Sequence, residues 1–226
     1  MILVLMCLIT VHLKSQAKDK TFSYKKGQVF DIILLNTKTG IEEDRDSYFK
    51  TAFPVATKYG YTGQGGLALI DTPSQGNYHP ESMIFGVWTS LQRRLDFLAD
   101  IEGVMPNFHE ARRKIWSSFN LTYWEMKEDL SFTVKADKYN VATLYWQESE
   151  RPFNQFKANW TKQAKNAGGK EVLVLTNGDS PFGYHFDPDY LVITEWESKA
   201  AFDKFYKENL KMNHDGVKHV NQFIIQ

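Results

Sequence analysis

The chain has 226 residues, and its 27 lysines and arginines balance its 27 aspartates and glutamates. A chain with no net charge offers no field that would attract nucleic acid or an anionic membrane, so neither is an expected partner. Aromatic residues make up 15% of the sequence. Because they are spread along its whole length, this content indicates a packed globular protein and excludes a disordered one.

Residues 1–17 have the pattern of a secretory signal peptide. Their first part is almost wholly apolar but too short to cross a bilayer as a helix, and Ser15 and Ala17 are small residues at −3 and −1 before Lys18. The sequence therefore predicts a secreted or periplasmic protein without stable membrane insertion after the leader is cleaved. The only cysteine, Cys7, lies in the leader, so the mature chain would have no thiol for a disulfide or a nucleophile.

After an extension at 18–28, residues 29–128 follow the order strand, helix, strand, strand, helix, strand. Their first helix places aromatic residues and alanines at helical spacing and stops at Gly60. The glycines from Gly63 to Gly66 are interpreted as a turn, and an insertion at 102–118 is expected to add a helix. The predicted elements are a strand at 29–36, a helix at 44–59, strands at 67–70 and 83–88, a helix that begins after Ser90, and a strand at 121–126.

Residues 137–226 repeat this order after a linker at 129–136, in which Phe132 and Val134 could extend an edge strand. The long loop at 177–183 joins the two middle strands of this second module. The predicted elements are a strand at 140–146, a helix at 151–167, strands at 172–176 and 190–196, a helix at 198–210 and a strand at 220–225.

The two modules are related by a shift of 108 residues. This shift aligns Pro80 with Pro188 and Trp88 with Trp196, and within the first helices it aligns Tyr48 with Phe156 and Ala52 with Trp160. A repeat of this size indicates a duplicated domain, because solenoids are built from shorter units in larger number. The element order within each unit is that of a split β-α-β, or ferredoxin-like, module.

Each module has an antiparallel sheet with helices on one face, so the other face of the sheet needs cover. In the strand at 140–146 neither face is fully polar. Stacking one sheet on the other buries both faces at once. The expected fold class is therefore α+β, with two tandem ferredoxin-like modules packed sheet to sheet as a pseudo-dimeric α/β barrel.

The segment from Trp196 to Phe202, with the sequence WESKAAF, is a strand that ends in tryptophan followed by a helix that opens Ser-x-x-Ala-Phe. It resembles the dimeric α/β-barrel superfamily, which includes antibiotic-biosynthesis-type monooxygenases, haem-degrading monooxygenases and uncharacterised families. The equivalent segment from Trp88 to Leu95 keeps the tryptophan and Ser90 but lacks the Ala-Phe pair. The resemblance implies the fold more strongly than any activity, because members of one fold differ in chemistry.

For the haem-degrading members, the resemblance implies an asparagine on the first strand, a tryptophan at the end of the third and a histidine near the end of the second helix. The candidates in chain order are Asn36, Trp88 and His109 in the first module, and Trp196 and His214 in the second, where Leu144 aligns with Asn36. His109 falls in the insertion and the second module lacks the asparagine. We therefore expect no specific haem site and no other cofactor, and we interpret both tryptophans as structural.

No metal site is expected either, because the histidines have neither helical ligand spacing nor a nearby cysteine. The leading hypothesis for function is an aromatic-lined cavity, with Trp88, Tyr145 and Trp196 in its walls, that binds a small and mainly apolar molecule. One alternative is a non-catalytic structural or interaction module whose barrel is filled by its own side chains. The other alternative is a cofactor-independent or haem-linked monooxygenase. A homodimer formed through the outer surfaces stays open.

Overall fold

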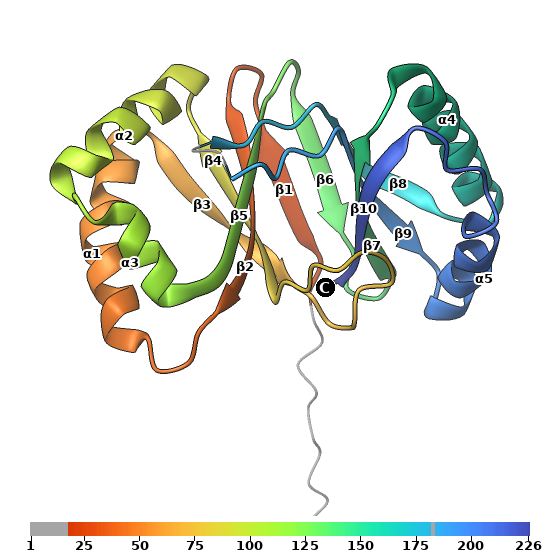
Figure 1. Cartoon of the computed structure of the whole chain (residues 1–226), viewed down its shortest axis with the longest axis horizontal. Helices are drawn as coiled ribbons and strands as arrows, with labels where there is room; N and C mark the ends of the chain where they lie inside the picture. Colours follow the sequence, from red (N-terminus) through yellow and green to blue (C-terminus); the bar gives the residue numbers. More distant parts are fainter. Residues whose placement is uncertain (1–17, 182–183) are drawn as a thin grey trace, which may run out of the picture.

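The computed structural model describes residues 18–181 and 184–226, so the predicted signal peptide at 1–17 lies outside the described residues. Two four-stranded antiparallel sheets face each other, and the helices cover their outer faces (Figure 1). Within the described residues, no helix is both long enough and apolar enough to span a membrane.

The first module is built on a sheet with strand order β3-β4-β2-β5, covered by three helices. The insertion contributes a helix, α3, as expected. The bounds of its elements are β2 (Val29–Thr37), α1 (Glu42–Lys58), β3 (Tyr61–Ala68), β4 (Ser82–Trp88), α2 (Leu91–Val104), α3 (Phe108–Ile115) and β5 (Trp116–Glu125).

The second module has the sheet order β10-β7-β9-β8 and two helices. In both modules the first and third strands are central and the fourth and second are at the edges, which is the ferredoxin-like order. The predicted α+β fold is therefore confirmed. The elements are β7 (Tyr139–Gln147), α4 (Glu150–Asn166), β8 (Lys170–Thr176), β9 (Tyr190–Trp196), α5 (Lys199–Asn209) and β10 (Val217–Ile225).

The repeat is visible in the helix caps but is offset in the first strands. Ser90 and Ser198 are both N-caps whose side chains accept a hydrogen bond from the backbone N–H three residues later, at 3.3 Å. In β2, however, Val29 pairs with Trp88, whereas in β7 Tyr139 pairs with Trp196. The first strands are therefore related by 110 residues. The structural equivalent of Asn36 is Trp146 and not Leu144, as the shift of 108 had suggested.

Two predicted boundaries in the first module were wrong. The glycine-rich segment from Gly63 to Gly66 lies within β3 and is not a turn, and a bulge between Gly63 and Gly65 accommodates the positive φ of 84° at Gly65. Strand β5 begins at Trp116, five residues before the predicted start, because it pairs with β2 along its whole length.

A two-stranded ribbon joins the N-terminal extension to the linker. Strand β1 (Lys20–Tyr24) pairs antiparallel with β6 (Leu130–Val134), so both segments are more ordered than the sequence analysis predicted. On the outer face of the ribbon, hydroxyl pairs join Thr21 to Thr133 and Ser23 to Ser131. The alternate residues Phe22, Tyr24, Phe132 and Val134 belong to the core.

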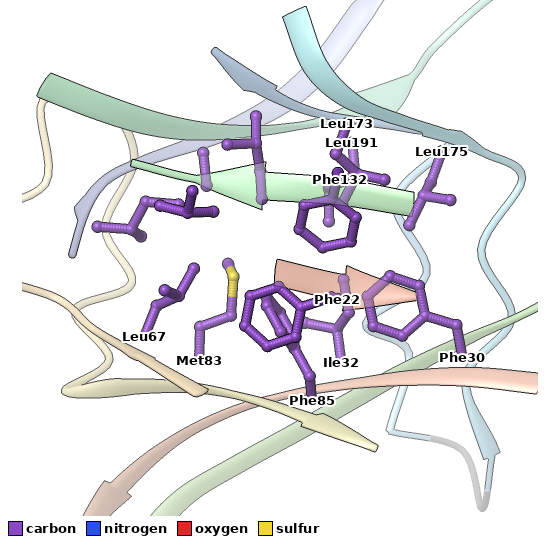
Figure 2. Packing of buried hydrophobic residues seen from close by; sticks show 14 of the residues in the cluster. Phe22, Phe30, Ile32, Leu67, Met83, Phe85, Phe132, Leu173, Leu175 and Leu191 are labelled. Carbon is purple, nitrogen blue, oxygen red and sulfur yellow. The ribbon is translucent and has the colours of Figure 1, made fainter. Parts of the chain in front are cut away.

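The space between the two sheets is filled by side chains. Phe22 and Phe132 of the ribbon lie between residues from both sheets, and Phe85 packs edge-on against Phe22 with ring centroids 4.6 Å apart (Figure 2). Leu67, Met83 and Ile32 come from one side, and Leu173, Leu175 and Leu191 from the other. This packing supports the alternative in which the interior of the barrel holds its own side chains.

Backbone hydrogen bonds join the sheets at their edges. Ala68 and Gln226 exchange two bonds of 2.9 Å, which link the end of β3 to the end of β10. At the opposite edge, Tyr123 of β5 exchanges two bonds with Asp179, in the loop after β8. The modules therefore form one continuous unit rather than two separate domains.

Candidate functional site

The helix-covered sides of the two sheets are packed differently. In the second module, Trp160 of α4 is buried and meets Phe205 of α5 edge-on, with ring centroids 5.5 Å apart, and Tyr145 of β7 at 6.1 Å. These three rings fill the space between the helices and the sheet. The second module therefore has a close-packed aromatic core on this side.

In the first module the same space is a cavity of about 390 Å³. Ala52 takes the place of Trp160, and by strand register Leu35 takes the place of Tyr145. Both small replacements line the cavity, so the missing aromatic volume accounts for it. The other lining residues are Asp31, Ile33, Thr37, Arg45, Tyr48, Phe49, Phe53, Ala56, Tyr61, Ser82, Ile84, Trp88, Arg94, Phe97, Leu98, Arg112, Trp116, Phe119, Leu121 and Pro181.

A buried ion pair forms the floor of this cavity. Arg94 of α2 donates from Nε to Asp31 Oδ1 at 3.0 Å, and Trp88 donates from Nε1 to Asp31 Oδ2 at 2.8 Å. The Asp31 and Arg94 side chains are only 3% and 2% exposed. The Arg94 guanidinium also lies 3.9 Å from the centroid of the Tyr123 ring. Aspartate, arginine and tryptophan are thus held as one rigid group.

The polar groups of the floor are not fully satisfied by the protein. Burial raises the pKa of the Asp31 carboxyl, and the charge of Arg94 and the hydrogen bond from Trp88 offset part of that rise. The Nη1 atom of Arg94 is buried and has no hydrogen-bond partner among the described residues. A buried donor without an acceptor costs about 1–3 kcal/mol.

Tyr61 and Trp88 extend the floor with two aromatic rings whose centroids are 4.9 Å apart and whose planes are tilted by 51°. A side chain at Gly86 would overlap the Tyr61 ring, since a Cβ built there would lie 2.5 Å from that ring. Glycine at this strand position therefore allows the tyrosine to lie over the sheet. At the other end, Phe49 and Phe53 are 44% and 45% exposed, which places the opening of the cavity beside α1.

The candidate residues of the first module lie in different surroundings. Trp88 lines the cavity. Asn36 of β2 donates to His79 O, and its carboxamide oxygen accepts from the Ser118 hydroxyl of β5. Its amide therefore links β2 to β5 and to the loop before β4. His109 of α3 lies 3.2 Å from Glu102 and borders a neighbouring pocket instead of the cavity.

The candidates of the second module belong to its packed core. Tyr145 is fully buried, and Trp196 stacks on Phe205 with ring centroids 5.0 Å apart. His214 lies beside this core. Its Nδ1 is 2.8 Å from Met212 O, and its ring centroid is 5.1 Å from that of Phe156. Trp88, Tyr145 and Trp196, which were expected to share one cavity, therefore lie in two separate cores on opposite sides of the barrel.

The residues of the cavity do not fit a haem group. Its lining includes no histidine, cysteine or methionine as an axial ligand for haem iron, and its two tyrosines are unsuited to that role, because Tyr48 OH accepts from Arg112 Nε and burial raises the pKa of Tyr61. In the parts of the chain that the structure describes, no three histidine, cysteine or acidic side chains are grouped as a metal site would require. His185, Asp187 and His219 border a third pocket beside Trp146, but they form no such group.

The sequence analysis missed Asp31, Arg94, Arg112 and Ala52. An aspartate inside the apolar run VFDIILL was a usable signal, since a charge within a buried strand needs a partner. The repeat gave a second signal. At the positions where the second module has Phe202 and Val141, the first module has the charged residues Arg94 and Asp31. Asp31 and Arg94, the two departures from the repeat named here, both line the cavity.

Comparisons with known proteins agree on the fold. No protein-family model matches the chain, and no curated protein does. Among solved structures, an anthrone oxidase-like protein is similar over 91% of this chain and 94% of its own, with 15% identity and a TM-score of 0.52. A mutant chlorite dismutase from Candidatus Nitrospira defluvii covers 90% and 92%, with 9% identity and a TM-score of 0.48. The strand order and the likeness to the anthrone oxidase-like structure show the fold alone, which is two tandem ferredoxin-like modules packed sheet to sheet.

Proposed function

We propose that the first module binds a small, mainly apolar molecule in the cavity between its sheet and its helices. The observation that carries this proposal is the asymmetry of the repeat: Trp160 fills the second module, whereas Ala52 leaves the equivalent space open. The volume of about 390 Å³ falls within the range of about 300–1,000 Å³ that is usual for ligand sites. The aromatic walls favour a flat ring system.

The floor would orient that molecule. Asp31 is fixed by Arg94 Nε and Trp88 Nε1, so the floor presents one polar group beneath apolar walls. A polar group on one edge of the ligand would lie against this floor. Few polar groups in an apolar wall set orientation, while burial supplies most of the binding free energy.

Ala52→Trp should abolish binding without loss of the fold. The indole would occupy the cavity as Trp160 does in the second module, and filling a cavity tends to leave stability unchanged or to raise it. N-phenylnaphthylamine, a neutral dye that fluoresces in apolar surroundings, serves as the probe. We expect its affinity to fall about tenfold or more in the variant, as measured by fluorescence titration, with the melting temperature kept.

Lys50→Trp is the matched control, because it adds the same side chain to the exposed face of the same helix. This variant should bind the dye as the wild type does. If wild type does not bind the dye, or if Ala52→Trp binds it equally well, the cavity is not a ligand site. The filled-barrel alternative, a structural or interaction module, would then be favoured.

Oxidation of the bound molecule is a second candidate function. The observation in its favour is the Asp31 carboxyl on the cavity floor, whose pKa is raised by burial, since such a group can accept a proton from an acidic C–H or O–H group. The fold is also shared with a protein described as anthrone oxidase-like. In the cofactor-independent form of this chemistry, the deprotonated substrate itself reacts with oxygen.

Anthrone is the substrate to test, with oxygen uptake as the measurement. If this activity is present, uptake should exceed the spontaneous rate and should be lost in Ala52→Trp, which closes the cavity. The rate should rise with pH as the Asp31 carboxyl ionises. Because burial raises the pKa of this carboxyl, the rise should occur at a higher pH than the value of about 4 at which an ordinary aspartate ionises. If wild type takes up oxygen no faster than Ala52→Trp, the cavity does not catalyse this oxidation, and ligand binding alone would stay as the proposed function.

A further inference from the structure

Arg112 of α3 lies between the cavity and a second pocket and forms part of both linings. Its guanidinium is 4.1 Å from the Phe108 ring centroid and 4.5 Å from that of Phe119. Its Nε donates to Tyr48 OH at 2.9 Å and its Nη1 to Tyr184 OH at 3.4 Å. Rings and phenols therefore fix the position of this half-buried cation.

The charge of Arg112 lowers the pKa of the Asp31 carboxyl in part, but that carboxylate is already bonded to Arg94. Within residues 18–181 and 184–226, no carboxylate forms an ion pair with Arg112, and no protein acceptor is bonded to its Nη2. Removing a guanidinium from water without an anionic partner is unfavourable. The position is therefore suited to receive an anion.

The surroundings of Arg112 are also positive, although the whole chain is neutral. The charged residues lining the cavity are Arg45, Arg94, Arg112 and Asp31; Asp31 is paired with Arg94, and Arg45 lies 3.4 Å from Asp46. The second pocket, of about 380 Å³, adds Arg113, and Ser117 and Ser118 add hydroxyl groups, whereas His109 on its border lies 3.2 Å from Glu102. The two pockets share Trp116 and Phe119 as well as Arg112.

We infer that the ligand of this site is an amphipathic organic anion, with its ring system in the cavity and its acidic group on Arg112 at the border of the second pocket. This inference rests on the proposed function and adds the chemical class of the ligand. Guanidinium groups suit this task because they bind carboxylates and related anions through parallel N–H donors.

The test compares two dyes that share one ring skeleton. Anilinonaphthalene sulfonate carries an acidic group, and N-phenylnaphthylamine is the same skeleton without it. Wild type should bind the sulfonate about tenfold more tightly than the neutral dye, the effect of one or two charge-assisted hydrogen bonds. Arg112→Gln should remove this preference, measured as the ratio of the two affinities, and Arg112→Lys should restore part of it.

Arg93→Gln is the control for net charge, since it removes an exposed arginine of α2 that lines neither pocket. It should keep the preference for the sulfonate. If wild type binds both dyes equally, or if Arg112→Gln keeps the preference for the sulfonate, the inference is wrong. Binding of the neutral dye would in that case still support an apolar site. Failure of the neutral dye to bind wild type would instead contradict the proposed function itself.

Discussion

Replacing Asp31 by Val, or Arg94 by Phe, should each destabilise the protein by about 3–5 kcal/mol, because either change leaves an unpaired charge in the core. The double variant should be more stable than either single variant. Its residues are those that the second module has at the equivalent positions, Val141 and Phe202, where the same backbone packs without a charge.

The double variant should still fall short of the wild type. Trp88 Nε1 donates only to Asp31, so the substitution leaves a buried N–H without an acceptor, at a cost of about 1–3 kcal/mol. In the second module Trp196 donates to Thr194, a residue that Gly86 replaces in the first. The remaining deficit would therefore include the lost indole hydrogen bond and the lost contact of Arg94 with the Tyr123 ring.

Urea unfolding of the four proteins in this cycle measures the coupling between the two residues. Lys199 and Asp203, an ion pair on the surface of α5 with side chains 58% and 44% exposed, provide the control cycle. Their coupling should be close to zero because water screens exposed charges. If the two buried substitutions are additive, the ion pair is not a unit and our account of the cavity floor is wrong.

Trp160→Ala should destabilise the second module by about 3–5 kcal/mol, the usual cost of removing a large buried aromatic side chain. The indole is 1% exposed and lies between Phe205 and Tyr145. Its removal should open a space like the cavity of the first module. The variant should therefore bind a second equivalent of N-phenylnaphthylamine, which fluorescence titration would count.

Trp160→Phe is the matched control. It keeps most of the aromatic volume and removes an Nε1 that has no hydrogen-bond partner in the described structure, so its stability should stay within about 1.5 kcal/mol of wild type. A second dye site in this variant, or an unchanged melting temperature in Trp160→Ala, would show that Trp160 does not fill the space that Ala52 leaves open.

The repeat made the architecture predictable, because hydrophobic periodicity and matching caps indicated the same elements twice. The ribbon of β1 and β6 was less accessible. Its strands have only five residues each and lie more than a hundred residues apart, so local patterns gave no sign of their pairing. Local signals for the strands themselves were the alternation of polar Thr21 and Ser23 with Phe22 and Tyr24, and Phe132 and Val134 in the linker.

The site was less predictable than the fold for a related reason. Trp88 was found because it repeats, yet the residues that create the cavity are those that fail to repeat. Ala52 is unremarkable in a helix, and only the comparison with Trp160 shows that volume is missing there. Arg112 escaped notice because its partners come from α1, α3, β5 and the loop at Tyr184, and sequence spacing cannot show that convergence.

The β1–β6 ribbon has a consequence for the order of folding. Each module can form its own sheet and helices from contacts within about a hundred residues, but Thr21 and Thr133 are separated by 112 positions. Loop closure over such a distance is entropically costly, and contacts of this kind form late. Phe22 therefore reaches Phe85 and Phe132 only after both segments of the ribbon have left the ribosome. Until then the inner face of the first sheet stays open, and the nascent first module depends on its successor for a complete core.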